Sequence, residues 1–307
     1  MRHITAADLS GPIDWSRYLA AIEDGHRRPP AKIEDVFLGE DGRTLLSRAA
    51  WVEGIGFGVK TVTAMTANAA RGIPTVHGAM MLLDEHTGQV RALVDSDVLT
   101  NIKTVSDSVL GARFLARPES QVLLIVGAGS VASQLAVAYP AIFPDLKEVL
   151  IWNRTHERAV ALAGTLAATG LSVTAASSLR AALSRADIVS AATMSASPVL
   201  EGDMVQAGTH VDLIGAFRKD MREADDALIR KSKVFVDSRN STFEHIGELR
   251  IPLTQGTISK ADVLGDLYDI VAGRIPSRKD RDITLFKNGG GAHLDLMVAD
   301  AILHGLA

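Results

Sequence analysis

A glycine-rich turn is the feature of this sequence whose chemistry is easiest to state. Gly127, Gly129 and Ala132 follow the pattern G-x-G-x-x-A directly after the apolar run 122–126. In such a pattern the first glycine permits a sharp turn, the second lets the backbone approach a pyrophosphate, and the alanine keeps the next helix close to its sheet. The first N–H groups of that helix then face the phosphates. A structural glycine turn is the alternative, but the flanking segments favour a dinucleotide site with contacts from Gly127, Ala128, Gly129, Ser130 and Val131.

The residues after the second apolar segment, 149–152, indicate which dinucleotide binds. NAD sites usually carry an acidic residue here for the ribose 2′-hydroxyl, whereas arginine suits a 2′-phosphate. The sequence has Asn153, Arg154 and Thr155 and no acid, and an arginine can hold a phosphate through two parallel hydrogen bonds. We therefore expect these three residues to contact the cofactor, and NADP(H) to bind in preference to NAD(H). The alternative is a solvated Arg154 and an Asn153 that caps the helix beginning near His156.

A hydride-transfer site also needs a pocket beside the nicotinamide, and in such folds this pocket lies at the carboxyl ends of the strands. Thr193, Met194 and Ser195 end one of the predicted strands. The two hydroxyl groups could bind the ribose or the nicotinamide amide, or could simply cap the strand. We assign all three residues to the cofactor site.

Two lysines and a histidine could act on a substrate. Lys60 stands among small and apolar residues of the alternating stretch 56–63, and a lysine in such a strand is costly unless it is paired or functional. It could hold a substrate carboxylate or polarise a C=N bond. Lys103, taken alone, reads as a surface lysine on a helix, and His77 as either a proton donor or a plain strand histidine. The histidines are scattered and cysteine is absent, so we expect no metal site.

Two regions with different patterns of predicted secondary structure position these residues. Short alternating segments separated by turns fill residues 32–94 and predict an antiparallel sheet or partly closed barrel. From residue 121 strands and helices alternate, which predicts a doubly wound parallel sheet. The expected strands are 122–126, 149–152, 172–175, 187–193, 209–214 and 233–237, and the expected helices are 97–115, 133–142, 156–168, 178–185, 264–271 and 293–306. Residues 1–30 carry a mixed helical pattern that ends at two prolines.

Composition narrows the class of protein. The chain has 307 residues, 47% of them hydrophobic, and a net charge of −4. This balance predicts a globular protein that does not bind nucleic acid. No apolar run approaches the roughly 20 residues that span a bilayer, and the N-terminus lacks the apolar core of a signal peptide. We therefore expect no membrane partner and a cytoplasmic location.

Six stretches together resemble the ornithine cyclodeaminase/mu-crystallin family. The resemblance runs from about residue 30 to the C-terminus, in the family's order, through residues 58–60, 68–78, 84–88, 99–104, 126–132 and 286–296. It implies an α/β fold with a Rossmann domain, residues 118–291. It also implies a β-rich domain that binds substrate and dimerises, formed by residues 1–117 and 292–307. A homodimer acting on an α-imino or α-amino acid is expected.

The resemblance also assigns roles to single residues. Lys60 falls on a lysine near the substrate carboxylate and the reacting carbon. Lys103 falls where many members have an arginine that grips this carboxylate; lysine keeps the charge but loses the two-pronged geometry. Phe217 stands where cyclodeaminases carry a catalytic aspartate, which members that reduce cyclic imines or ketimines do not need. The remaining assignments are His77 and Gly291, with Phe217, to the substrate pocket, and Gly290 to the cofactor.

The function implied is NAD(P)H-dependent reduction of a cyclic α-imino acid to the L-amino acid. 1-Pyrroline-2-carboxylate and 1-piperideine-2-carboxylate are the expected substrates. Ornithine cyclodeamination, reductive amination of a 2-oxo acid as in alanine dehydrogenase, and reduction of an acyclic imino acid stay open. So does a non-catalytic, mu-crystallin-like protein that binds a ligand with NADP.

Overall fold

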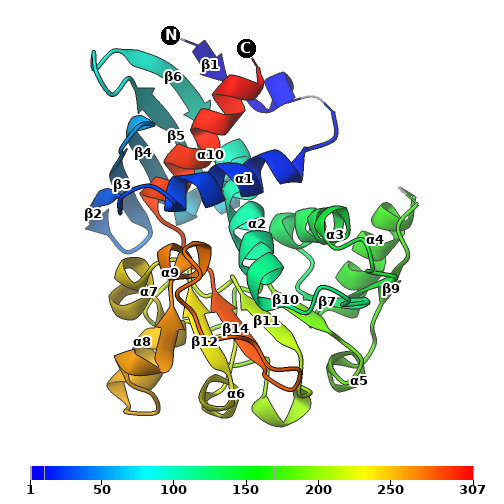
Figure 1. Ribbon diagram of the computed structural model, residues 1–307. Helices are drawn as coiled ribbons and strands as arrows, with labels where there is room; N and C mark the ends of the chain where they lie inside the picture. The colour runs from blue at the N-terminus through cyan, green and yellow to red at the C-terminus, as the bar shows by residue number, and fades with distance from the viewer. Residues whose placement is uncertain (1, 10, 169, 307) are drawn as a thin grey trace. The chain divides into compact units, whose positions relative to one another are not determined.

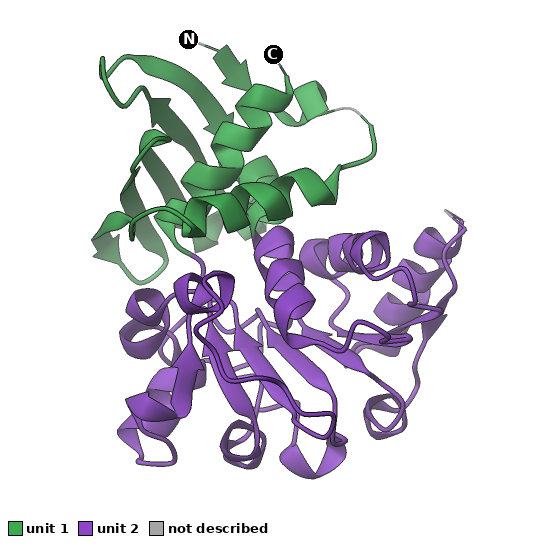
Figure 2. Cartoon of the chain, in the orientation of Figure 1, with its two compact units in different colours: residues 1–103, 291–307 green, residues 104–290 purple. Residues whose placement is uncertain are grey.

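The computed structural model describes residues 2–9, 11–168 and 170–306, which form two compact units (Figures 1 and 2). Unit 1 comprises residues 1–103 and 291–307, and unit 2 comprises residues 104–290. The division falls within the long helix α2 (Ser96–Leu115), whereas the sequence places the boundary just after it, at residues 117 and 118.

Unit 1 contains a six-stranded sheet. Its strands are β1 (Arg2–Ile4), β2 (Lys32–Glu40), β3 (Arg43–Val52), β4 (Gly56–Met65), β5 (Val76–Leu83) and β6 (Val90–Asp95). Their spatial order is β1-β6-β5-β4-β3-β2, so β1 and β2 are the edges of an open sheet. Neighbours from β2 to β6 are antiparallel, as expected. The mixed helical pattern expected for residues 1–30 is wrong at its start, because β1 pairs in parallel with β6.

A hairpin joins β2 and β3 through a turn of two residues, Asp41 and Gly42, within the region where the sequence predicts short strands separated by turns. Gly42 has a φ of +83°, in the left-handed region that glycine adopts without a Cβ penalty. Two 3-10 helices, η1 (Ala6–Leu9) and η2 (Thr66–Arg71), complete the connections of unit 1.

Two helices of unit 1 pack against each other: α1 (Trp15–His26) and α10 (Ala292–Gly305). The C-terminal helix α10 packs against β3, β4 and β5 and also against α1 (Figure 1). The helices approach closely at Gly25, where a Cβ would lie 2.3 Å from the Met297 sulfur. The last helix therefore belongs to the core of unit 1, although the chain reaches it only after completing unit 2.

Unit 2 is built on eight parallel strands, which confirms the predicted fold class. They are β7 (Val122–Val126), β8 (Glu148–Trp152), β9 (Val173–Ala175), β10 (Ile188–Ala191), β11 (His210–Leu213), β12 (Lys233–Val236), β13 (Val263–Gly265) and β14 (Thr284–Lys287). Their spatial order is β13-β12-β14-β11-β10-β7-β8-β9. The chain runs outward from β7 to β9 and then returns to the other side of β7 with β10. This reversal creates a crevice at the carboxyl ends of β7 and β10, where open parallel sheets bind ligands.

Helices on both faces bury the sheet, so β7 is apolar along its whole length and β10 carries a single polar residue, Ser190. They are α3 (Ser130–Ile142), α4 (His156–Ala167), α5 (Leu179–Leu183), α6 (Asp226–Lys231), α7 (Arg239–His245), α8 (Gly247–Thr254) and α9 (Leu267–Val271), with the 3-10 helices η3 (Gly202–Met204) and η4 (Lys260–Asp262). The helix expected over 264–271 is wrong in its first half. Residues Leu264 and Gly265 belong to β13, and Asp266 caps α9 by accepting hydrogen bonds from the backbone N–H groups of Tyr268 and Asp269.

Candidate dinucleotide pocket and substrate lysines

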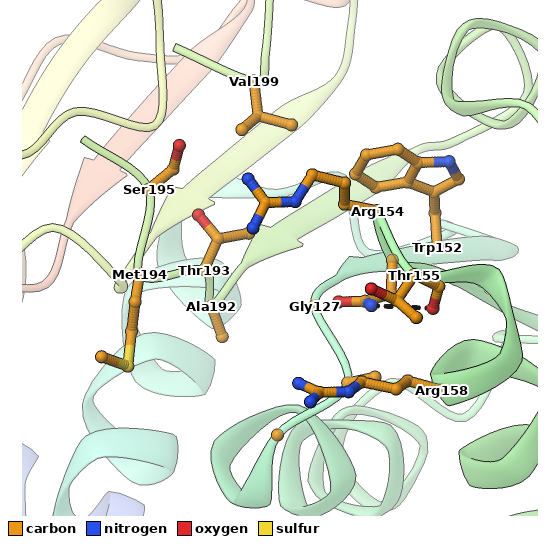
Figure 3. A pocket seen from close by; sticks show the side chains of 13 residues that line it. Gly127, Trp152, Arg154, Thr155, Arg158, Ala192, Thr193, Met194, Ser195 and Val199 are labelled. Atoms are coloured by element: carbon orange, nitrogen blue, oxygen red, sulfur yellow. Dashed lines mark hydrogen bonds between the residues drawn. The ribbon is translucent and has the colours of Figure 1, made fainter. Parts of the chain in front are cut away.

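A pocket of about 320 Å³ opens in unit 2 at the carboxyl ends of β7, β8 and β10 (Figure 3). Its lining residues are Gly127, Ala128, Gly129, Trp152, Asn153, Arg154, Thr155, Arg158, Ala192, Thr193, Met194, Ser195 and Val199. Nine of these were assigned to the cofactor from the sequence. Three other assigned residues, Ser130, Val131 and Gly290, do not line it.

The glycine turn has the geometry that a pyrophosphate site requires. Gly127 has a φ of +131°, and a Cβ there would lie 2.7 Å from the Ala192 carbonyl oxygen. Its N–H donates to the Trp152 carbonyl at 2.8 Å, which ties the turn to β8. At Gly129, the N-cap of α3, a Cβ would meet nothing within 4 Å. The backbone is thus open on this side, and a phosphate can approach the helix N-terminus.

Two arginines enter the pocket from the segment after β8. Arg154 and Arg158 both direct their guanidinium groups into the pocket (Figure 3), and no carboxylate is among its lining residues. Asn153 is not the cap of α4, since Thr155 holds that position. Instead the Asn153 side-chain amide donates to the Thr155 carbonyl at 2.9 Å. Arg154 and Arg158 are the charged side chains among the lining residues of this pocket.

The two hydroxyl groups expected at the end of β10 have different partners. Thr193 Oγ1 donates to the Glu223 carboxylate at 2.7 Å, and Ser195 Oγ donates to the Ser197 carbonyl at 2.6 Å. Ser195 thus closes a local turn, whereas Thr193 connects the pocket wall to a buried acid.

The lysine expected in unit 1 lies in a charged cluster. Lys60, on β4, is only 7% exposed, and its Nζ donates to Asp295 Oδ1 at 2.9 Å and to Thr100 Oγ1 at 2.7 Å. Burial lowers the pKa of Lys60; Asp295 opposes this shift and Lys103 adds to it. Lys103 is 6% exposed, so the reading as a surface lysine is wrong. Two lysines and one aspartate leave a net charge of +1 in this cluster.

The imidazole of His293, on α10, adds no charge to this region. It is buried, and burial lowers its pKa well below the usual value, with His26, Arg48 and Lys103 contributing in the same direction. His293 also explains the glycine before α10, because a Cβ on Gly291 would lie 2.6 Å from its ring.

Two of the other substrate residues expected from the sequence, His77 and Phe217, are exposed, whereas Gly291 is buried. His77 is an exposed residue of β5 in unit 1. Phe217 follows β11 in unit 2, is 56% exposed, and has the Arg218 guanidinium 5.9 Å from its ring centre. Gly290 donates its N–H to Asp237.

Sequence comparison identifies the family. The family model of the ornithine cyclodeaminase/mu-crystallin family matches residues 16–305. The chain belongs to this family. The resemblance found in the sequence is thereby confirmed over nearly its full length.

Three relatives within the family are informative. A Delta(1)-pyrroline-2-carboxylate reductase of Paracoccus denitrificans is 50% identical over 99% of this chain and 96% of its own length. A solved structure of the Thermococcus litoralis Delta(1)-pyrroline-2-carboxylate reductase, in complex with NADH and L-proline, has a TM-score of 0.91 and 27% identity, covering 99% of this chain and 97% of that one. An archaeal alanine dehydrogenase dimer with bound NAD has the same TM-score and identity, covering 99% and 95%.

Within this family member, sequence reasoning missed several residues around the two sites. Arg158 comes four residues after Arg154, in the first turn of α4, and this second arginine was visible in the sequence. Asp295, the partner of Lys60, lies 235 positions away in the chain, and no local pattern links the two residues. Over the described parts of the chain, no helix is both long and apolar enough to cross a bilayer.

Proposed function

We propose that this oxidoreductase reduces a cyclic α-imino acid of the 1-pyrroline-2-carboxylate or 1-piperideine-2-carboxylate type to the corresponding L-amino acid. The observation that carries the proposal is the buried Lys60–Lys103–Asp295 cluster, whose net charge of +1 matches a single substrate carboxylate. The 50% identity with a pyrroline-2-carboxylate reductase supports the substrate class.

The cluster suits the binding of a carboxylate for electrostatic reasons. The buried Lys60 ammonium group donates one hydrogen bond to Asp295 and one to Thr100, so its third N–H remains available for a substrate. An arriving carboxylate would compensate the second lysine charge, and charge-assisted hydrogen bonds of this kind are the strong ones. Lys60 and Lys103 would hold the substrate, and the ring nitrogen would be protonated.

The reaction is balanced by one hydride and one proton. A nicotinamide cofactor held by the residues of the dinucleotide pocket would supply the hydride for the new C–H bond at C2, and the C=N π pair would become the amine lone pair. The protonated imine is already electrophilic, so the protein's main tasks are orientation and charge compensation.

NADP(H) is the cofactor that we propose this chain prefers. The support is local: Arg154 and Arg158 line the pocket, and no carboxylate does. The two solved relatives hold NADH and NAD, so the preference rests on these two arginines of this chain.

Ornithine cyclodeamination is the activity that we propose this chain lacks. Phe217 takes the place of the acid that this reaction needs, and a phenyl ring can neither accept a proton nor hold a cationic amine. Asp220, three residues further on, is exposed and paired with Arg218 at 3.0 Å.

A homodimer is proposed for the assembly. The edge strand β2 exposes the consecutive apolar side chains Val36, Phe37 and Leu38, at 50%, 61% and 60%. An exposed apolar edge strand of this kind invites pairing with another chain. A second copy is the occupant we propose, in agreement with the dimeric alanine dehydrogenase relative. The cytoplasmic location stays a prediction.

The test is an assay of cofactor oxidation across substrates. NADPH and NADH are offered with 1-pyrroline-2-carboxylate, 1-piperideine-2-carboxylate, pyruvate with ammonia, and pyruvate with methylamine. We expect the cyclic imines to be turned over fastest and with NADPH. Faster turnover of pyruvate with ammonia would instead indicate that the protein catalyses reductive amination of 2-oxo acids. Cofactor binding without any oxidation would make it a binding protein.

A further inference from the structure

A buried carboxylate lies directly behind one wall of the dinucleotide pocket. Glu223 has no exposed surface. Its Oε1 accepts hydrogen bonds from the Thr193 N–H and from Thr193 Oγ1, both at 2.7 Å, and its Oε2 accepts from the Gly215 N–H at 2.6 Å. Thr193 lines the pocket and Glu223 does not. The acid can therefore act on a bound dinucleotide only through Thr193.

This carboxylate fastens the ends of two neighbouring strands, β10 and β11. The backbones approach so closely that a Cβ on Gly215 would lie 1.5 Å from the Thr193 carbonyl oxygen. Only glycine fits there, and Glu223 satisfies the N–H groups on both sides of the contact. The Thr193 hydroxyl oxygen lies 2.7 Å from Glu223 Oε1, a distance at which either oxygen can be the donor if Glu223 is protonated.

The surroundings of Glu223 make both of its protonation states accessible. Glu248, on α8, lies beside it and accepts from the N–H groups of Glu223 and Ala224 at 2.7 and 3.0 Å. Lys287, on β14, is a buried cation whose charge acts on Glu223, and it donates to the Leu213 and Ile214 carbonyls at 2.9 and 3.2 Å. Its charge is shared with three further carboxylates, those of Glu248, Asp237 and Asp212, and Arg222 faces Glu248.

Burial raises the pKa of Glu223 to about 7, with Glu248 adding to the shift and Lys287 opposing it. Glu223 therefore changes its protonation state within the pH range in which enzymes are usually assayed. The same proton decides the direction of the hydrogen bond to Thr193.

We propose that Glu223 is a positioning residue that determines whether the Thr193 hydroxyl accepts or donates a hydrogen bond within the dinucleotide pocket. Ionised Glu223 can only accept, so the Thr193 hydrogen points at it and only oxygen lone pairs are offered to the pocket. Glu223 protonated on Oε1 donates to Thr193 Oγ1, and the Thr193 hydrogen is released toward the pocket. The backbone bonds from Thr193 and Gly215 persist in both states.

This inference rests on the pocket being the nicotinamide dinucleotide site. A dinucleotide presents mainly acceptor oxygens, on its phosphates, riboses and carboxamide. Protonation of Glu223 therefore turns the Thr193 hydroxyl into a donor toward the acceptor oxygens of the dinucleotide. It also removes the negative charge of the carboxylate behind Thr193. Dinucleotide affinity should fall as the pH rises through about 7, by about three- to tenfold, the worth of one hydrogen bond.

The test measures NADH binding by fluorescence on both sides of this pH in wild type, Thr193→Val and Thr193→Ser. NADH is used because it lacks the 2′-phosphate, whose own protonation would contribute to the pH dependence. We expect wild type and Thr193→Ser, which keeps the hydroxyl, to bind more weakly at the higher pH. Thr193→Val should bind with little pH dependence. A Glu223→Gln variant, if folded, should also lose the dependence.

Equal pH dependence in Thr193→Val and wild type would overturn the proposal, because the effect would not pass through the hydroxyl. A wild-type affinity that does not change with pH would also overturn it. Failure to bind NADH and NADPH at any pH would instead refute the pocket assignment. Binding without turnover of any imine would refute the proposed reaction and leave this inference in place.

Discussion

Replacing Lys60 by methionine tests the substrate site, but the structure shows that the single substitution is a poor probe. Lys60 Nζ lies 2.9 Å from Asp295 Oδ1, and the side chains are 9% and 3% exposed. Methionine would fill much of the lysine volume and leave the aspartate as a buried charge without its cation. Breaking a buried pair in this way typically costs about 3–5 kcal/mol, a large part of a typical stability of about 5–15 kcal/mol.

The informative variant is therefore the double substitution Lys60→Met with Asp295→Asn. It removes both charges and keeps the shape of both side chains, so we expect it to recover most of the stability lost by Lys60→Met alone. It also removes Lys60, one of the two cations that we propose for the substrate carboxylate, and leaves Lys103 in place. Losing one partner of a buried charge pair costs about 2–5 kcal/mol, and kcat/KM for the imine should fall roughly 30- to 5,000-fold.

A matched control exists in the same unit. Arg91 on β6 pairs with Asp300 on α10 at 2.8 Å, and neither residue is assigned to the substrate. Arg91→Met with Asp300→Asn should leave kcat/KM near the wild-type value. Urea unfolding, NADPH affinity and steady-state rates are measured for all variants. A folded Lys60→Met/Asp295→Asn protein with wild-type kcat/KM would show that Lys60 serves only as the structural partner of Asp295.

Three further predictions follow from the two units. Arg154→Ala should weaken NADPH binding by roughly ten- to a hundredfold, the value of a charge-assisted bond to phosphate, and should leave NADH binding almost unchanged; Arg158→Ala should act in the same direction, and equal losses for both cofactors in fluorescence titrations would refute the NADP preference. Incubation with ornithine and NAD⁺ or NADP⁺ should release no ammonia and form no proline, because Phe217 replaces the acid; enzymatic rates of both products would show that Phe217 is no obstacle. Burial lowers the pKa of His210 to about 3, with Arg278 contributing, so below the usual value near 6.5 the unfolded chain binds a proton that the folded chain does not. This histidine should therefore lower the free energy of unfolding by about 1.4 kcal/mol for each pH unit of acidification below about 6.5, until the pH nears the folded-state pKa of about 3. In urea unfolding at several pH values, His210→Asn should lose this part of the pH dependence. An unchanged pH dependence would show that His210 does not have the lowered pKa.

The dinucleotide pocket could be predicted from the sequence because its signals are local. The glycine turn and the two apolar strands on either side of it lie within residues 122–152, and Arg154 comes two residues after the second strand. The parallel sheet also follows from the alternation of strands and helices, since parallel strands require crossovers; the order of its strands does not. Edge strand β1 has no such signal, because three residues carry too little pattern to indicate a strand.

The charged clusters could not be predicted because their members are far apart in the chain. Lys103 reads as a surface residue from its helix alone, and only the fold of unit 1 buries it next to Lys60. Glu223 and Lys287 come together only when β14 inserts between β11 and β12. Long-range pairing of this kind is a property of the topology, and sequence periodicity does not encode it.

The most direct test of the proposed reaction follows the hydride itself. The protein is incubated with 1-pyrroline-2-carboxylate and NADPH in which both hydrogens at nicotinamide C4 are deuterium, and the product is analysed by NMR and mass spectrometry. We predict L-proline with one deuterium at Cα, formed in equal amount to NADP⁺. Proline without deuterium at Cα, or no proline from a protein that binds NADPH, would contradict the proposed function.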